Sequence, residues 1–163
     1  MSVKAIIQVI ENLIRLHDAL LENAKQKTEA VKEGSLDKLQ MVLIEERKYI
    51  QLLEQSESDR KAAIDHWFLQ NNYPLNNRPT LTELLNLLSN QKEKNELERK
   101  SHLLKDLILL LKQQEQLNHA LIQQSMQFVQ LSLNVLNPSI NNMNYGNKSK
   151  KVSVKRTVFD SKA

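Results

Sequence analysis

Two acid–histidine pairs are the first candidates for chemistry in this 163-residue chain. Glu98 precedes His102 by four residues, and Glu115 precedes His119 by the same spacing. On a helix this spacing places both side chains on one face, where they could contact one metal ion. Metal centres in helical bundles instead use Glu-x-x-His spacing with further inward carboxylates. The sequence therefore predicts solvated pairs and no metal site.

Other catalytic motifs are missing from the sequence. Ser101 lies beside His102, but no nucleophile elbow surrounds it. The two glycines, Gly34 and Gly146, belong to no phosphate-binding loop. The chain has no cysteine, which excludes disulfides, thiolate metal sites and thiol nucleophiles. We therefore expect no enzymatic activity and no cofactor.

The elements that position these residues are predicted to be helices, because apolar residues recur at steps of four and three. In the first segment, roughly 3–32, these steps define one row along the helix. Its polar positions are His17 and Lys27, and its apolar positions are Ile6, Ile10, Leu13, Leu20, Ala24 and Val31. Gly34 then favours a left-handed helix end, and Ser35 favours the N-cap of the next helix. A helical hairpin is expected at this point.

The second helix is predicted over about 36–69, with one row formed by Leu39, Leu43, Ile50, Leu53, Ile64 and Trp67. Polar residues interrupt this row, which favours an extended hairpin over a tight globular core. Asparagines and prolines in 70–79 predict a loop. Thr80 and Glu83 have the spacing of a capping box, so a helix begins at Leu81. At Ser89 and Asn90 the chain either bends or continues as a helix.

The last helix has the strongest periodicity. One row, with Gln114 and Gln124 at its gaps, contains Leu103, Leu107, Leu110, Leu117, Leu121, Phe128, Leu131 and Val135. A flanking row contains Leu104, Ile108, Leu111, Ile122, Val129 and Leu136. One neighbouring helix cannot cover both rows, and each buried leucine is worth about 1.5–3 kcal/mol. The excess apolar surface predicts that this helix binds another protein.

The charge is divided unevenly along the chain. The net charge is +4, but residues 137–163 carry +5, and residues 1–136 carry −1. We therefore expect an all-α, elongated antiparallel hairpin with a third long helix over residues 1–136, followed by a flexible basic tail over 137–163. No segment reaches the ~20 apolar residues of a membrane-spanning helix, and the first apolar cluster is too interrupted for a signal-peptide core.

Several local sequences resemble the FlgN family of flagellar export chaperones. In the second helix, Glu45-Glu46-Arg47-Lys48-Tyr49-Ile50-Gln51-Leu52-Leu53 is similar to the family's Glu-Lys-x-x-Leu-Leu segment. Asn137-Pro138 follows the last helix, and Tyr145-Gly146 lies in the tail. The ending Phe159-Asp160-Ser161-Lys162-Ala163 is also similar to tails of the family.

The resemblance implies a cytoplasmic, non-enzymatic chaperone without cofactor that binds the C-terminal segments of hook-associated flagellar proteins and delivers them to the export gate. The last helix would bind the client, and its face comprises Leu117, Leu121, Gln124, Phe128, Leu131 and Val135. Tyr145 and Gly146 match the motif that docks on the cytoplasmic domain of the gate subunit. The family's glycines after that motif are missing here.

Two other functions stay open. The chain could be a structural coiled-coil subunit, in which self-association covers the helix faces. It could also bind nucleic acid or a membrane surface through its basic tail, with binding that falls steeply with salt. The body itself lacks the basic stripe of a nucleic-acid-binding surface, so we expect no nucleic-acid partner and no stable membrane insertion. A homo-oligomer is compatible with the sequence.

Overall fold

The computed structural model describes residues 3–74 and 79–136 of the chain. It divides into two compact units, residues 1–121 and residues 122–163, called unit 1 and unit 2 below. The described residues form four helices and no strand, namely α1 (Lys4–Glu33), α2 (Leu36–Gln70), α3 (Leu81–Leu87) and α4 (Gln91–Leu136). The predicted all-α fold is confirmed.

The turn between α1 and α2 forms where the sequence predicts it. Gly34 has a φ of 66°, in the left-handed region, and its backbone N–H donates toward the carbonyls of Ala30 and Val31 at the end of α1. Ser35 caps the next helix, because its hydroxyl accepts from the backbone N–H of Lys38 at 3.3 Å. These two residues therefore end one helix and begin the next within two positions.

Gly34→Ala should lower the free energy of unfolding by about 1 kcal/mol, because a Cβ is disfavoured in the left-handed region. No heavy atom outside its immediate neighbours lies within 4 Å of the added Cβ, so the backbone conformation alone sets the cost. Urea denaturation measures the loss. Gly34→Asn is the matched control and should lose less, because asparagine tolerates this conformation. Equal losses in both variants would contradict this explanation.

A break separates the short helix α3 from α4. Thr80 and Glu83 form the predicted capping box, with side chain to backbone distances of 2.9 and 3.2 Å. After α3 ends at Leu87, Leu88 adopts an extended conformation. The side chain of Asn90 then accepts from the backbone N–H groups of Lys92 and Glu93. Asn90 thus caps a new helix, which settles the question that the sequence left open.

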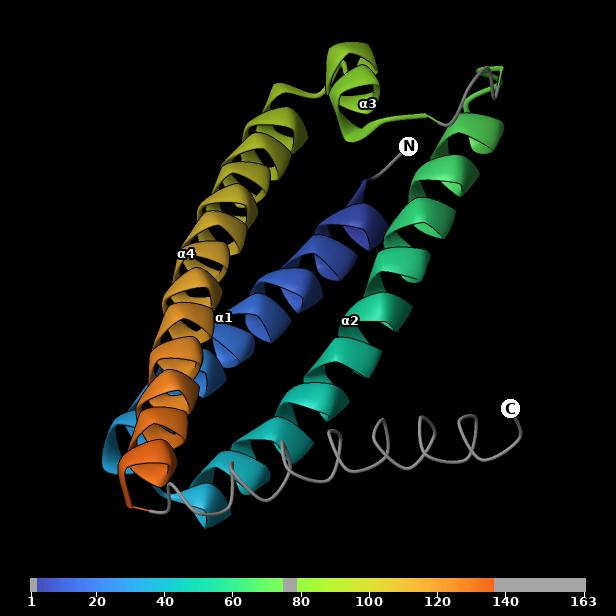
Figure 1. Ribbon diagram of the computed structural model, residues 1–163. Helices are drawn as coiled ribbons and strands as arrows, with labels where there is room; N and C mark the ends of the chain where they lie inside the picture. Colours follow the sequence, from blue (N-terminus) through green and yellow to red (C-terminus); the bar gives the residue numbers. More distant parts are fainter. Residues whose placement is uncertain (1–2, 75–78, 137–163) are drawn as a thin grey trace, which may run out of the picture. The chain divides into compact units, whose positions relative to one another are not determined.

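Hydrogen bonds between the long helices of unit 1 show the direction in which each helix runs. Asn12 bonds Ser56 and Lys27 bonds Glu46, so α1 and α2 are antiparallel, as predicted. Lys100 bonds Glu11, and Glu115 bonds the later Lys27, so α4 runs parallel to α1. Within unit 1, α1 therefore contacts both other long helices (Figure 1).

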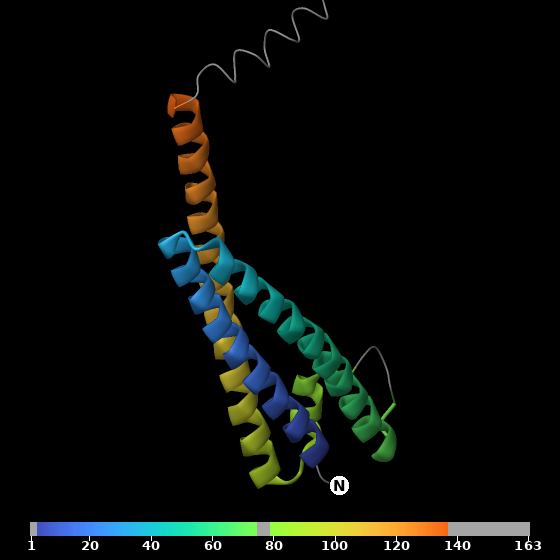
Figure 2. The ribbon, with the colours of Figure 1, turned by 90° about the horizontal axis from the view of Figure 1, so that it is seen from below.

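The apolar core of unit 1 lies at the end where α1 begins and α2 ends. Figures 1 and 2 show α3 at this same end. Trp67 packs edge-on against Phe68 and stacks on Tyr73, with centroid distances of 5.4 and 5.9 Å. The buried cluster comprises Val3, Ile6, Ile7, Ile10, Ile64, Trp67, Phe68, Leu84 and Leu97.

Toward the hairpin turn the helix interface becomes polar. Buried positions there include His17, Asn23, Lys27, Thr28 and Asn118. The row predicted along α1 is confirmed from Ile6 to Lys27, with His17 and Lys27 buried at its polar positions, whereas Val31 is only half-buried and Ala30 is buried instead. Hydrogen bonding, rather than apolar burial alone, therefore determines how the helices face one another in this half of unit 1.

The predicted row along α2 is partly wrong. Leu43 and Ile50 are exposed, whereas Val42 is buried one position away. The reason is that Asn23 donates to the carbonyl of Val42 at 3.1 Å and Lys27 pairs with Glu46 at 2.7 Å. These polar contacts fix the rotation of α2 about its axis and turn Leu43 and Ile50 toward solvent.

Candidate protein-binding site

The two apolar rows of α4 have different surroundings in unit 1. Along one row, Leu97, Ser101 and Asn118 are buried, whereas Ile108 of the same row is 45% exposed. The row that contains Leu103, Leu110 and Leu117 is about half exposed, at 47–49%. Unit 1 therefore buries part of one row of α4 and leaves large apolar side chains of the other row in contact with solvent.

The residues predicted to bind a client lie along this second row, which we call row A: Leu117, Leu121, Gln124, Phe128, Leu131 and Val135. Leu117 and Leu121 belong to unit 1, where Leu121 is half-buried. The other four belong to unit 2 and are exposed, with 70% exposure for Phe128. The structure thus brings all six onto one helix and leaves the largest of them accessible.

A hydrogen-bond network that includes Asn118 and Gln114 holds α4 against α1. The amide of Asn118 donates to the carbonyl of Ala24 at 2.8 Å, and its oxygen accepts from the hydroxyl of Thr28. Gln114 donates to that same hydroxyl at 2.6 Å. Because each of these polar groups would be costly to bury alone, the network fixes which row of α4 faces inward.

A buried lysine connects the three long helices of unit 1. The Nζ atom of Lys27 on α1 lies 2.7 Å from Glu46 on α2 and 3.0 Å from Glu115 on α4. Burial alone would lower the pKa of Lys27, but hydrogen bonds to these two carboxylates outweigh it and raise the pKa. Lys27 therefore stays charged at neutral pH and pairs with both helices.

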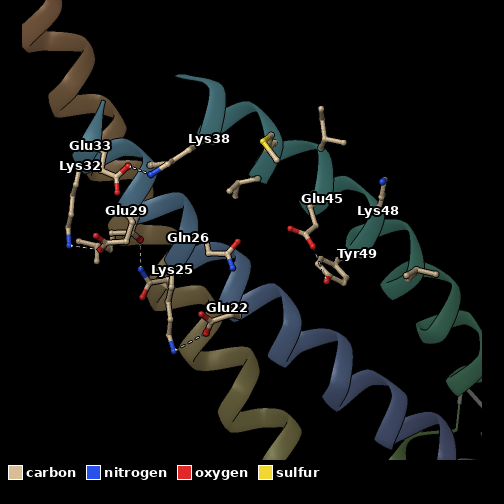
Figure 3. Close-up of a pocket in the computed structure, with 18 residues that line it drawn as sticks. Glu22, Lys25, Gln26, Glu29, Lys32, Glu33, Lys38, Glu45, Lys48 and Tyr49 are labelled. Carbon is tan, nitrogen blue, oxygen red and sulfur yellow. Dashed lines mark hydrogen bonds and ion pairs between the residues drawn. The ribbon is translucent and has the colours of Figure 1, made fainter. Parts of the chain in front are cut away.

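A groove of about 1170 Å³ lies between α1 and α2 near the hairpin turn (Figure 3). Its apolar lining includes Met41, Val42, Ile44 and Leu52 of α2. Leu117 of α4 also lines it. The first residue of row A therefore borders an apolar groove within unit 1.

The charged residues around this groove are largely paired with one another. Figure 3 shows the pairs Lys25–Glu22, Lys32–Glu29 and Lys38–Glu33, of which the first two have N–O distances of 3.7 and 3.1 Å. On α2 the hydroxyl of Tyr49 donates to Glu45. The negative charge of Glu45 raises the pKa of Tyr49, so this hydroxyl stays protonated at neutral pH.

The acid–histidine pairs do not converge on a metal site in the described residues. The carboxylate of Glu115 bonds Lys27, while His102 and His119 are exposed. Among residues 3–74 and 79–136, no three His, Asp or Glu side chains are arranged to hold a metal ion. In that same part of the chain, no helix combines the length and apolarity that crossing a membrane requires.

The predicted docking residues Tyr145 and Gly146, and the basic tail over 137–163, lie outside the described residues. Sequence reasoning also missed Thr28 and Asn118, because polar side chains at these positions look like surface residues. Their spacing carried a signal: Asn118 lies three and four positions from Glu115 and Ile122, in step with the flanking row. Polar residues that continue an apolar row are candidates for buried networks.

The described helices include an exposed apolar face on α4, which is the kind of surface by which helical proteins bind other proteins. The chain matches the model of the family described as "FlgN protein" over residues 1–153. It is also 36% identical over 166 residues, covering 100% of both chains, to a Bacillus subtilis (strain 168) protein named "Uncharacterized protein YvyG". No solved structure matches the chain. The chain belongs to the FlgN family of flagellar export chaperones.

Proposed function

We propose that this chaperone binds the C-terminal segments of hook-associated flagellar proteins through row A, in the cytoplasm. Bound in this way, the client's segment is kept from assembling before export. The tail then docks the complex on the cytoplasmic domain of the export-gate subunit. Family membership supports the general role, and row A supports the location of the client.

One observation carries the client site: row A stays exposed although it consists mostly of large apolar side chains. Leu131 and Val135 are 62% and 70% exposed. A soluble protein that keeps such a row accessible gains free energy when a partner covers it. An amphipathic helix of the client, with its own apolar residues at steps of three and four, matches this surface.

Phe128→Asp should weaken client capture at least about thirtyfold, because it places a charge at the centre of the apolar contact. Calorimetric titration with purified full-length hook-associated proteins of the source bacterium measures this effect. The helical circular-dichroism signal should stay unchanged, because Phe128 is exposed and does not support unit 1.

Gln127→Asp is the matched control for this test. It introduces the same charge next to Phe128, on the polar side of α4, and should keep most of the affinity. Wild-type capture by folded Phe128→Asp protein would reject row A as the client site. Equal losses in both variants would show that charge anywhere on this segment, rather than the apolar row, determines capture.

Tyr145 is the proposed gate-docking residue. Tyr145 lies in a mostly polar segment, and its ring and hydroxyl suit a pocket on a partner. Gly146 permits a turn that presents the ring. This assignment is based on the resemblance of Tyr145-Gly146 to the family motif. We assign client binding to α4 alone.

Tyr145→Ala should lower affinity for the gate domain by about 2 kcal/mol, or about thirtyfold, and leave client affinity unchanged. Purified cytoplasmic gate domain is titrated against the preformed complex of chaperone and client. Tyr73→Ala is unsuitable as a control because Tyr73 stacks on Trp67. Tyr145→Phe is used instead, to separate the effect of the ring from that of the hydroxyl. Unchanged gate affinity would remove Tyr145 from the mechanism.

A further inference from the structure

The described part of unit 2 is a helical segment without charge. Residues 122–136 contain no Asp, Glu, Lys, Arg or His. Within α4 this composition contrasts with residues 91–115, which contain six lysines and arginines and five acidic residues. A solvated helix face normally carries such charges. The absence of charge over fifteen residues distinguishes this segment from an ordinary solvated helix.

Row A is joined in unit 2 by a second apolar row, which we call row B: Ile122, Met126, Val129, Leu133 and Leu136. At 3.6 residues per turn, the centres of the two rows lie about 140° apart around the helix axis. Only the small side chains of Ser125 and Ser132 lie between them. The polar side is restricted to an arc formed by Gln123, Gln127, Gln130 and Asn134.

Row B is as accessible as row A. Its members from Met126 to Leu136 are 55–76% exposed. Together the two rows occupy roughly 220° of the helix circumference, whereas contact with one neighbouring helix needs an arc of about 100°. A single client helix that covers row A therefore leaves row B in water.

Charge and symmetry indicate which molecule covers row B. The basic part of the chain's own tail, residues 148–156, carries Lys148, Lys150, Lys151, Lys155 and Arg156, and the neutral segment offers these cations no counter-charge. A second copy would present the same two rows, so a closed two-fold contact through one row would leave the other uncovered on each copy. A client that supplies two neutral helix faces covers both rows at once.

We infer that one client molecule docks two amphipathic, uncharged helical faces on residues 122–136, one on row A and the other on row B. The inference rests on the proposed client binding and extends it from one face of the helix to two. Ser125 and Ser132 permit the two client helices to approach each other closely. Because no charged group participates, affinity should change less than about threefold between 50 and 500 mM salt.

Met126→Gln/Leu133→Gln tests row B without adding charge or a helix breaker. Titrated with the purified full-length hook-associated proteins, this variant should bind the client at least about tenfold more weakly. Gln123→Ala/Gln130→Ala, on the polar arc, is the matched control and should retain wild-type affinity. If Phe128→Asp abolishes binding while the row B variant keeps wild-type affinity, the two-sided arrangement is wrong and the one-sided client site stands.

Photo-crosslinking identifies what covers each row. A photoreactive residue in place of Leu131 on row A, or of Leu133 on row B, should attach to the same client at two different segments of its sequence. A chaperone–chaperone product from position 133 would show that a second copy covers row B and would overturn the inference. Failure of both row variants to weaken binding would reject the proposed client site itself.

Discussion

Lys27→Ala should destabilise unit 1 by about 3 kcal/mol, near the lower end of the range for breaking a buried ion pair. The side chain of Lys27 is only 7% exposed, and its removal leaves Glu46 and Glu115 without their shared cation. The lower end applies because Glu115 retains contact with water. Chemical denaturation at pH 7 measures the loss. A loss below about 1 kcal/mol would show that the pairs behave like exposed surface bridges.

A triple variant separates the charge from the packing. Lys27→Met/Glu46→Leu/Glu115→Leu removes all three charged groups and fills their space with apolar side chains. Such replacements are often neutral or stabilising, so the triple variant should recover most of the lost stability. A triple variant as unstable as Lys27→Ala would assign the effect to lost packing instead of unpaired carboxylates.

The raised pKa of Lys27 determines the pH range in which its ion pairs contribute to the free energy of unfolding. Because the folded-state pKa lies above the ordinary lysine value of 10.5, the contribution of Lys27 to stability is complete below that value. It is lost as the pH rises through the folded-state pKa. The difference in stability between wild type and Lys27→Ala should therefore be constant around neutral pH and shrink only in strong alkali.

Leu97→Ala should lower the free energy of unfolding by about 2–5 kcal/mol. Leu97 of α4 is completely buried in the cluster that joins α1, α2 and α3, so truncation removes apolar contacts and leaves a cavity. Urea denaturation measures the change. Leu109→Ala on the same helix is the matched control and should cost less than about 0.5 kcal/mol, because Leu109 is exposed. Equal losses would contradict the burial of this row.

Local signals predicted the helices well. The turn at Gly34, the capping box of Thr80 and Glu83, and the end of α2 at Gln70 lie where sequence rules place them. Each depends on a few adjacent residues whose backbone requirements are strong. The row along α1 was predictable for the same reason, because its spacing is regular and mostly apolar.

Which face of α2 and α4 turns inward could not be predicted. Leucines are abundant on both helices, so apolar spacing alone permits more than one rotation. The rotation follows from pairings between distant polar residues, such as Asn23 with Val42 and Thr28 with Asn118. A single sequence does not show such partners. The sequence predicted excess apolar surface on α4 and a client-binding face from Leu117 to Val135, but it did not show the polar contacts that hold the helix against α1.

The parallel course of α1 and α4 has a consequence for the order of synthesis. Thr28 and its partner Asn118 are 90 positions apart, so most of unit 1 leaves the ribosome before this contact can form. The hairpin of α1 and α2 is complete much earlier, because its contacts join closer residues. During that interval the surface of α1 near Lys27 and Thr28 is polar and readily hydrated, so leaving it uncovered costs less free energy than leaving an apolar surface uncovered.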